Sequence, residues 1–121
     1  MKRFFDSYAL IEMVKGNPHY ARFLDDEIAT TIFNLAEVIY SALRDYGEDR
    51  AGLVARKYSP SIMDIDHGVL SRAMLFRRQN SKKDLSYADC VGYTMAREMG
   101  ISFLTGDEQF RGFDGVEFVK A

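Results

Sequence analysis

The sequence predicts an α/β fold of the α/β/α sandwich type, with helices on both faces of a short, mainly parallel central sheet. Short apolar runs that suit strands alternate with longer segments whose apolar residues recur at helical spacing. Strands separated by helices favour parallel pairing with right-handed crossovers. The 121 residues, 47% of them hydrophobic, are enough for one core and too few for two. We therefore expect residues 1–121 to form a single domain.

The first half of the chain predicts two strands and four helices. The strands are compact apolar runs, the second of them β-branched, at residues 4–5 and 28–32. The helices have apolar residues at helical spacing and lie at residues 8–14, 18–24, 35–47 and 48–58. The Gly16-Asn17-Pro18 segment separates the first two helices, because glycine ends a helix and proline suits the first turn of the next.

The second half predicts three more strands and two helices. The strands are apolar runs at residues 61–65, 101–104 and 116–119. The helices lie at residues 69–76 and 87–99, with a polar loop at residues 80–84 between them. Gly100 closes the second of these helices.

The composition argues against several classes of protein. No stretch approaches the roughly 18 uninterrupted apolar residues of a membrane span, and Asp6 comes too early for a signal peptide. The single cysteine, Cys90, has no partner for an internal disulfide and suits a cytoplasmic location. With His19 and His67 as the only imidazoles, structural zinc is not favoured. The net charge of −2 argues against binding nucleic acid by bulk electrostatics.

Charge is nevertheless distributed unevenly. The segment from His67 to Lys83 contains no acid and carries five basic side chains, Arg72, Arg77, Arg78, Lys82 and Lys83. Most such segments are solvated faces. Because this one ends just before Asp89, a basic lip beside an acidic pocket is the alternative interpretation.

Four acids lie where apolar runs give way to helical pattern: Asp6, Glu37, Asp89 and Asp107. Their position matters because open α/β sheets bind ligands in the crevice outside the carboxyl ends of their parallel strands. Four acids in one crevice would repel each other strongly unless a hard divalent cation neutralised them. The pattern therefore predicts a magnesium or manganese site.

Each acid also has a structural explanation when it is taken alone. Asp6 suits the N-cap of the first helix, and Asp107 suits the cap of a turn at residues 108–110. The segments Asn34 to Glu37 and Ser86 to Asp89 have the spacing of capping boxes. Helix capping does not require all four acids to follow apolar runs. For the four acids together, a metal-binding crevice is therefore the favoured interpretation.

The four segments that contain these acids resemble the PIN-domain ribonucleases, and most closely the VapC-like toxins of prokaryotic VapBC toxin–antitoxin pairs. The resemblance covers essentially the full chain and rests on Phe5 to Ile11, Asn34 to Val38, Leu85 to Cys90 and Leu104 to Phe110. Each motif is weak alone, whereas all four in order at the expected intervals are specific. One departure is that no fifth acid is marked unless Asp114 approaches the pocket.

The resemblance implies a metal-dependent endoribonuclease. One or two Mg²⁺ or Mn²⁺ ions would activate water for in-line attack on phosphorus and stabilise the leaving oxygen. Asp6, Asp89 and Asp107 are then expected to contact metal, directly or through water. Glu37 is expected to position the attacking water or to act as its base.

The remaining expected site residues support these acids. Ser7 and Thr105 would orient the carboxylates through hydrogen bonds. The basic residues expected to contact RNA are Arg77, Arg78, Lys82 and Lys83.

The resemblance also implies a protein partner, an antitoxin that lies over the groove and inserts a basic side chain among the acids. Independently of it, the early helices carry more large apolar residues than one small sheet covers, which predicts a homodimer. These residues are Tyr8, Ile11, Tyr20, Phe23, Phe33 and Tyr40.

Three alternatives remain open. The first is a PIN-like RNA-processing nuclease outside a toxin–antitoxin pair, and the second is an inactive domain of this fold that only binds. The third is a phosphoacceptor receiver domain. It needs two adjacent acids after the first strand, whereas Asp6 stands alone, and a lysine after the last core strand, whereas Lys120 is penultimate in the chain.

Overall fold

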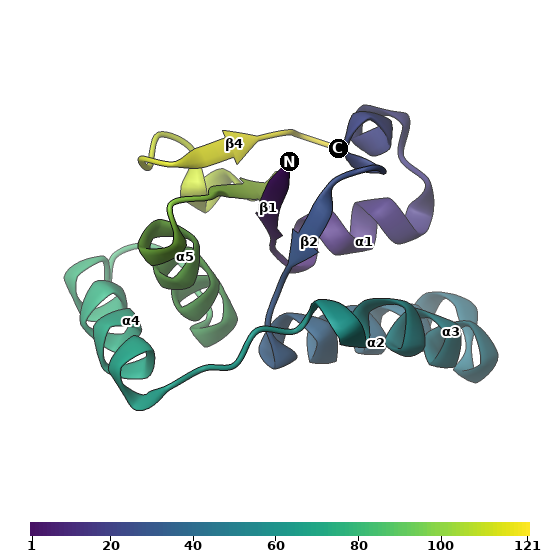
Figure 1. Ribbon diagram of the computed structural model, residues 1–121, viewed down its shortest axis with the longest axis horizontal. Helices are drawn as coiled ribbons and strands as arrows, with labels where there is room; N and C mark the ends of the chain where they lie inside the picture. Colours follow the sequence, from purple (N-terminus) through teal and green to yellow (C-terminus); the bar gives the residue numbers. More distant parts are fainter.

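A four-stranded, entirely parallel sheet forms the centre of the computed structural model, which describes residues 1–121 (Figure 1). Its strands are β1 (Lys2–Phe5), β2 (Glu27–Ala29), β3 (Ser102–Thr105) and β4 (Val116–Phe118), in the spatial order β2-β1-β3-β4. The central strand β1 pairs with β2 on one side and with β3 on the other. The strand order therefore reverses between β1 and β3, and the carboxyl edge at such a reversal is where sheets of this class bind ligands.

Five α-helices cover the two faces of the sheet. One face carries α1 (Ser7–Lys15), α2 (Ile32–Tyr46) and α3 (Glu48–Tyr58), and the other carries α4 (His67–Gln79) and α5 (Tyr87–Met99) (Figure 1). Three short 3₁₀ helices span Pro18–Phe23, Ser59–Ser61 and Glu108–Phe110. The predicted three-layer α/β/α class is confirmed. No helix combines the length and apolar composition that crossing a membrane requires.

Alternating strand residues divide the core into two. Phe5 points into the core under α1, α2 and α3, whereas its neighbour Phe4 points into the core under α4 and α5. Phe4 stacks on Phe103 of the adjacent strand, with ring centroids 5.5 Å apart. Burial on both faces explains why the two central strands carry consecutive apolar residues, Phe4-Phe5 in β1 and Phe103-Leu104 in β3.

The strand predicted at residues 61–65 is wrong. Ser59–Ser61 is a 3₁₀ turn containing Pro60, and only an isolated bridge joins Thr30 to Ile62. The residues after this turn pack as a connection between the two cores and pair only with Thr30. The strand predicted at residues 28–32 also ends early, because the Thr31 side chain caps α2, which begins at Ile32.

Two of the six apolar residues used to predict a dimer are core residues. Tyr20 and Phe23 are each 1% exposed, because the 3₁₀ helix that carries them folds back onto the sheet. The Tyr20 hydroxyl donates a hydrogen bond of 2.6 Å to the backbone oxygen of Val119. Phe33 and Tyr40, by contrast, are exposed.

Candidate active site

A cleft of about 500 Å³ opens at the carboxyl edge of β1 and β3. Its lining includes the four predicted acids, Asp6, Glu37, Asp89 and Asp107. Each acid comes from a different part of the fold: the end of β1, the second turn of α2, the first turn of α5 and the turn after β3. Residues as far apart in the sequence as Asp6 and Asp107 thus share one cavity.

Asp6 is the most buried of the four acids, with 2% exposure. Its backbone N–H donates to the Leu104 oxygen at 3.2 Å, which ties it to the neighbouring strand. Its carboxylate oxygen Oδ1 accepts a hydrogen bond of 2.9 Å from the backbone N–H of Ala9. Asp6 therefore caps α1 and lines the cleft at the same time, so the two interpretations of this acid are compatible.

Asp89 and Asp107 combine the same two roles. Asp89 forms a capping box with Ser86: the Ser86 N–H donates to the carboxylate at 2.9 Å, and the Asp89 N–H donates to the Ser86 hydroxyl at 3.0 Å. The Asp107 carboxylate accepts from the Gln109 N–H at 3.0 Å, and its own N–H donates to the Thr105 hydroxyl at 3.1 Å. Capping leaves the second carboxylate oxygen of each acid with further acceptor capacity.

Glu37 does not cap α2, so the capping box predicted between Asn34 and Glu37 is wrong. The cap is Thr31, three residues before Asn34, and this places Glu37 in the second turn of the helix. There its Oε1 accepts a hydrogen bond of 2.5 Å from the hydroxyl of Ser7. Glu37 is therefore oriented by α1 and not by its own helix terminus.

A chain of hydrogen bonds fixes the Ser7 hydroxyl. The Thr31 hydroxyl donates to Asn34 Oδ1 at 2.7 Å, and Asn34 Nδ2 donates to Ser7 Oγ at 3.0 Å. Because Asn34 Nδ2 donates to Ser7 Oγ and the Glu37 carboxylate only accepts, the Ser7 hydroxyl directs its proton to Glu37. Neither Thr31 nor Asn34 was predicted from the sequence as a residue that supports the site. The available signal was a Thr-x-x-Asn cap three residues before an acid of the candidate set.

The acids interact electrostatically. The pKa of Asp6 is raised to about 8, mainly by burial and to a smaller extent by the charges of Asp89 and Asp107, while hydrogen bonds from the Thr105 side chain and the Ala9 backbone oppose the increase. Burial also raises the pKa of Asp89 to about 6, with contributions from Asp107 and Glu37. Burial is the largest cause of both shifts, and the smaller repulsive part is expected where several carboxylates face one cavity and no cation neutralises them.

A fifth acid faces the cleft, and it is Asp84 and not Asp114. Asp84 lies just before the Leu85-Ser86 segment that leads into α5, whereas the Asp114 backbone oxygen accepts a hydrogen bond from Tyr93. Sequence reasoning missed Asp84 because it lies in the polar loop and not at the end of an apolar run. Tyr8 and Ile11 also line the cleft and were not predicted as site residues.

Among the four predicted basic contacts, only Arg77 lines the cleft. Its Nε donates to the Leu85 backbone oxygen at 3.2 Å. Arg78 and Lys82 are exposed outside the cleft lining, and Lys83 lies over the ring of Phe113, 5.2 Å from its centroid. The structure therefore divides the basic segment into one cleft residue and three outer ones.

Comparison with known protein families matches residues 3–116 to the PIN domain. The chain belongs to the PIN-domain family. The members of this family are nucleases, and this PIN domain shares their fold. Comparison with curated proteins gives no significant match.

Solved structures of the same fold include three from toxin–antitoxin systems. The VapC20 toxin of Mycobacterium tuberculosis, described as cleaving the sarcin–ricin loop, superposes with a TM-score of 0.80 at 17% identity, covering 98% of this chain and 99% of that one. A toxin–antitoxin complex from Klebsiella pneumoniae gives 0.75 at 20% identity, covering 95% of each chain. VapBC2 from Rickettsia felis, bound to a DNA fragment from its promoter, gives 0.73 at 12% identity, covering 100% and 99%. At these identities the likeness shows the fold.

The donor atoms of the PIN-domain cleft fit a hard divalent cation. The potential ligands are carboxylate and hydroxyl oxygens, without a histidine or cysteine in the lining. No three acidic, histidine or cysteine side chains lie close enough together to hold one ion directly. Since Mg²⁺ keeps several of its waters and takes one or two carboxylates directly, the separation of these acids suits an ion held partly through water.

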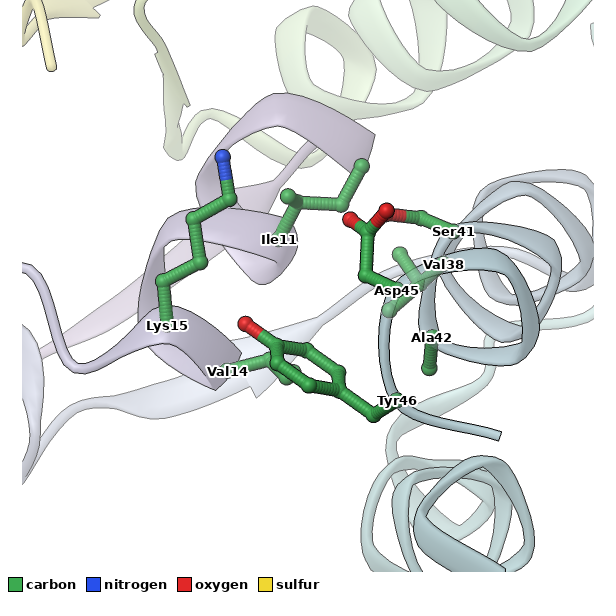
Figure 2. A pocket seen from close by; sticks show the side chains of 8 residues that line it. All are labelled: Ile11, Val14, Lys15, Val38, Ser41, Ala42, Asp45 and Tyr46. Carbon is green, nitrogen blue, oxygen red and sulfur yellow. The ribbon is translucent and has the colours of Figure 1, made fainter. Parts of the chain in front are cut away.

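A second hollow in the PIN domain has a different character. It lies between α1 and α2, is lined by Ile11, Val14 and Tyr46 among others, and has a volume of about 10 Å³ (Figure 2). That is about the space of one water molecule. The acidic cleft, at about 500 Å³, by contrast has room for a substrate.

Proposed function

We propose that this PIN domain is a Mg²⁺- or Mn²⁺-dependent endoribonuclease and the toxin of a type II toxin–antitoxin pair. The observation that carries the proposal is the convergence of four acids from four separate elements on one cleft, with raised pKa values at Asp6 and Asp89. Maintaining mutually repelling carboxylates destabilises the folded chain, which is expected where a cation and an anionic substrate are to be bound. The toxin role is supported by the fold shared with toxin–antitoxin proteins.

In the proposed reaction the acids have distinct roles. Asp6, Asp89 and Asp107 would hold one or two ions, and Thr105 and Ser7 would orient the carboxylates through hydrogen bonds. When bound, the cation supplies positive charge that neutralises the acids and offsets the charge developing on the phosphate. Glu37, held by Ser7, would accept a proton from the water that attacks phosphorus while the bond from phosphorus to the leaving oxygen breaks.

The basic segment would bind the RNA strand. Arg77 is the one basic residue that lines the cleft. Arg78, Lys82 and Lys83 lie outside the cleft lining, where they would contact phosphates further along the chain. RNA as the substrate implies that the protein acts in the cytoplasm.

An antitoxin would regulate the enzyme by covering the cleft. Five acids face a cavity that contains one arginine. A partner that inserts an arginine there would pair with the carboxylates through its planar guanidinium group and compete with the cation. Copurification of a small basic-tailed partner from the native host, released at high salt, would support this part of the proposal.

A homodimer is the proposed state of the chain alone. Ile32 and Phe33 at the start of α2 are 54% and 41% exposed and line an apolar groove of about 320 Å³ together with Met63 and Leu70. Exposed apolar surface of this kind supports association with a second copy. Light scattering of the parent and of Phe33→Glu is the test: the parent should be dimeric and the variant monomeric.

Sequencing of RNA ends after induced expression, beside assays of the purified chain with Mn²⁺, tests the nuclease function. The parent should produce new 5′ ends at defined positions, and Asp6→Asn should produce none. Growth arrest that a genetically adjacent small protein relieves would distinguish a toxin from an RNA-processing nuclease. Intact RNA with the purified parent and Mn²⁺ would contradict the proposal.

A further inference from the structure

We propose that Arg77 and Tyr87 form a platform at the rim of the acidic cleft, which holds one phosphate and an adjacent unpaired base of single-stranded RNA. The inference rests on the proposed endoribonuclease function. It adds a substrate-binding pair at the rim of the cleft, one member of which, Tyr87, was not predicted from the sequence.

Arg77 is held in place and yet not neutralised. It lies in the last turn of α4, where its Nε donates to the Leu85 backbone oxygen and its guanidinium lies 4.7 Å from the centroid of the Tyr87 ring. It forms no salt bridge, although it lines a cavity with five acids. Backbone bonding and stacking fix the position of this cation while its charge remains available.

The available part of Arg77 suits a phosphate. Its Nε is occupied by Leu85, which leaves the two terminal nitrogens as a planar pair of donors. A guanidinium pairs with two phosphate oxygens at once, in a geometry that lysine does not reproduce. Arg77 is also the only basic residue that lines the cleft. It can therefore attract an anionic RNA strand to a cavity whose five acids repel that strand.

Tyr87 supplies an aromatic surface beside this cation. It is the first residue of α5, two positions before Asp89, and it is 61% exposed. Its neighbour Ala88 is buried in the core, so Tyr87 lies on the outer face of the helix. The Arg77 guanidinium lies over the ring, and Tyr87 is otherwise open to solvent.

An exposed ring next to a phosphate-binding group favours a particular form of RNA. Bases stack on aromatic side chains when they are unpaired and turned out of a helix, and such stacking tolerates any base sequence. Bases inside a duplex are already stacked and do not reach the ring. The platform therefore favours a single-stranded segment beside the proposed cleavage point.

The chain contains a matched control for this pair. Arg50 lies over the ring of Tyr46 at the same centroid distance of 4.7 Å, and Tyr46 is 44% exposed. This second pair joins α2 to α3, and Tyr46 lines the small hollow of Figure 2 and not the acidic cleft. Substitution of Tyr46 therefore removes the same kind of contact away from the site.

Fluorescence anisotropy of the full chain with a short labelled single-stranded RNA of mixed sequence, in EDTA to prevent cleavage, tests the platform. Tyr87→Ala should weaken binding by about 5- to 150-fold, the range of one base–aromatic stack, while Tyr87→Phe should bind as the parent does. Arg77→Ala should weaken binding and lower the slope of log affinity against log salt by about one, the effect of losing one phosphate contact. Tyr46→Ala should leave binding unchanged.

Two modified RNAs locate the contact. An abasic site moved along the strand should weaken parent binding at one position, and at that position Tyr87→Ala should show no further loss. Annealing a complementary strand should remove the difference between the parent and Tyr87→Ala. Thermal melts of all variants verify the fold.

The outcomes separate this inference from the proposed function. If the parent binds and cuts RNA but Tyr87→Ala and Arg77→Ala bind like Tyr46→Ala, the platform is wrong and the nuclease proposal stands. If Tyr87→Ala loses as much affinity for duplex RNA as for single-stranded RNA, the assignment to single-stranded RNA is wrong. If the parent neither binds nor cuts RNA, both proposals fail together.

Discussion

The Ser7 hydroxyl donates a hydrogen bond of 2.5 Å to Oε1 of Glu37 and so joins the first turn of α1 to the second turn of α2. The two residues are thirty positions apart and meet because α1 and α2 pack on the same face of the sheet. Asn34 completes the arrangement by donating to Ser7 at 3.0 Å. Glu37 is thereby held in one orientation at the side of the cleft.

Removing this hydrogen bond should slow the proposed reaction. Ser7→Ala leaves Glu37 free to rotate, and loss of such a supporting contact typically costs about 10- to 100-fold in activity. The measurement is kcat/KM for RNA cleavage with Mn²⁺. Ser71→Ala, an exposed serine on α4, is the matched control and should retain full activity. Unchanged activity of Ser7→Ala would show that Glu37 needs no orientation by Ser7.

Stability of the metal-free chain should fall as pH rises from about 4 to about 8. The pKa of Asp6 is about 8 in the folded chain against an ordinary value of 3.8. Between these values the folded state binds a proton that the unfolded state releases, so the free energy of unfolding decreases with pH by up to about 1.4 kcal/mol per unit. Asp89, with a pKa of about 6, adds to the decrease in the lower part of the range.

Urea unfolding at several pH values in EDTA measures this dependence. Asp6→Asn should show a smaller decrease and should exceed the parent in stability near pH 8, because a neutral amide removes the buried charge. Asp25→Asn, an exposed acid outside the cleft, should follow the parent. A stability that increases over this range would contradict the raised pKa of Asp6.

A bound divalent cation should offset the repulsion between the carboxylates of the cleft and so stabilise the folded chain. A ligand that binds only the folded state stabilises it by about 2.7 kcal/mol at one hundred times its Kd. Millimolar Mn²⁺ should therefore raise the melting temperature of the parent by several degrees. Asp89→Asn should show a smaller increase, since it removes one proposed ligand. A melting temperature that is indifferent to Mn²⁺ in the parent would count against the metal site.

Gly106 should not tolerate a side chain. It lies between Thr105 and Asp107, and a Cβ there would collide with the Tyr8 ring and with the backbone oxygen of Val119. Because backbone cannot move aside as a flexible side chain does, Gly106→Ala should destabilise the chain by about 1–3 kcal/mol and lower cleavage by displacing Asp107.

The matched control for Gly106→Ala is Gly52→Ala in α3. There the new Cβ would meet only the Arg56 side chain at 3.8 Å, an ordinary contact, and alanine has the higher helix propensity. Gly52→Ala should therefore be neutral or stabilising in thermal melts and should leave cleavage unchanged. Equal stability of both variants would contradict the steric argument at Gly106.

The sequence by itself determined the local features of this protein. The α/β/α class, five of the helices and the caps at Asp6, Ser86 with Asp89, and Asp107 followed from periodicity and from contacts within three residues along the chain. Such features depend on backbone geometry that a short segment carries with it. The same acids were selected as site candidates because strand ends of a parallel sheet meet at one edge.

Tertiary structure alone decided the features that join distant segments. The partner of Glu37 is Ser7 and not its own helix cap, and the fifth acid in the cleft is Asp84 and not Asp114. The apolar run 61–65 forms no strand, because a strand requires a neighbour to pair with and only Thr30 offers one bridge. The positions of such residues follow from how helices and strands pack, and packing sums many weak contacts between residues that no local pattern relates.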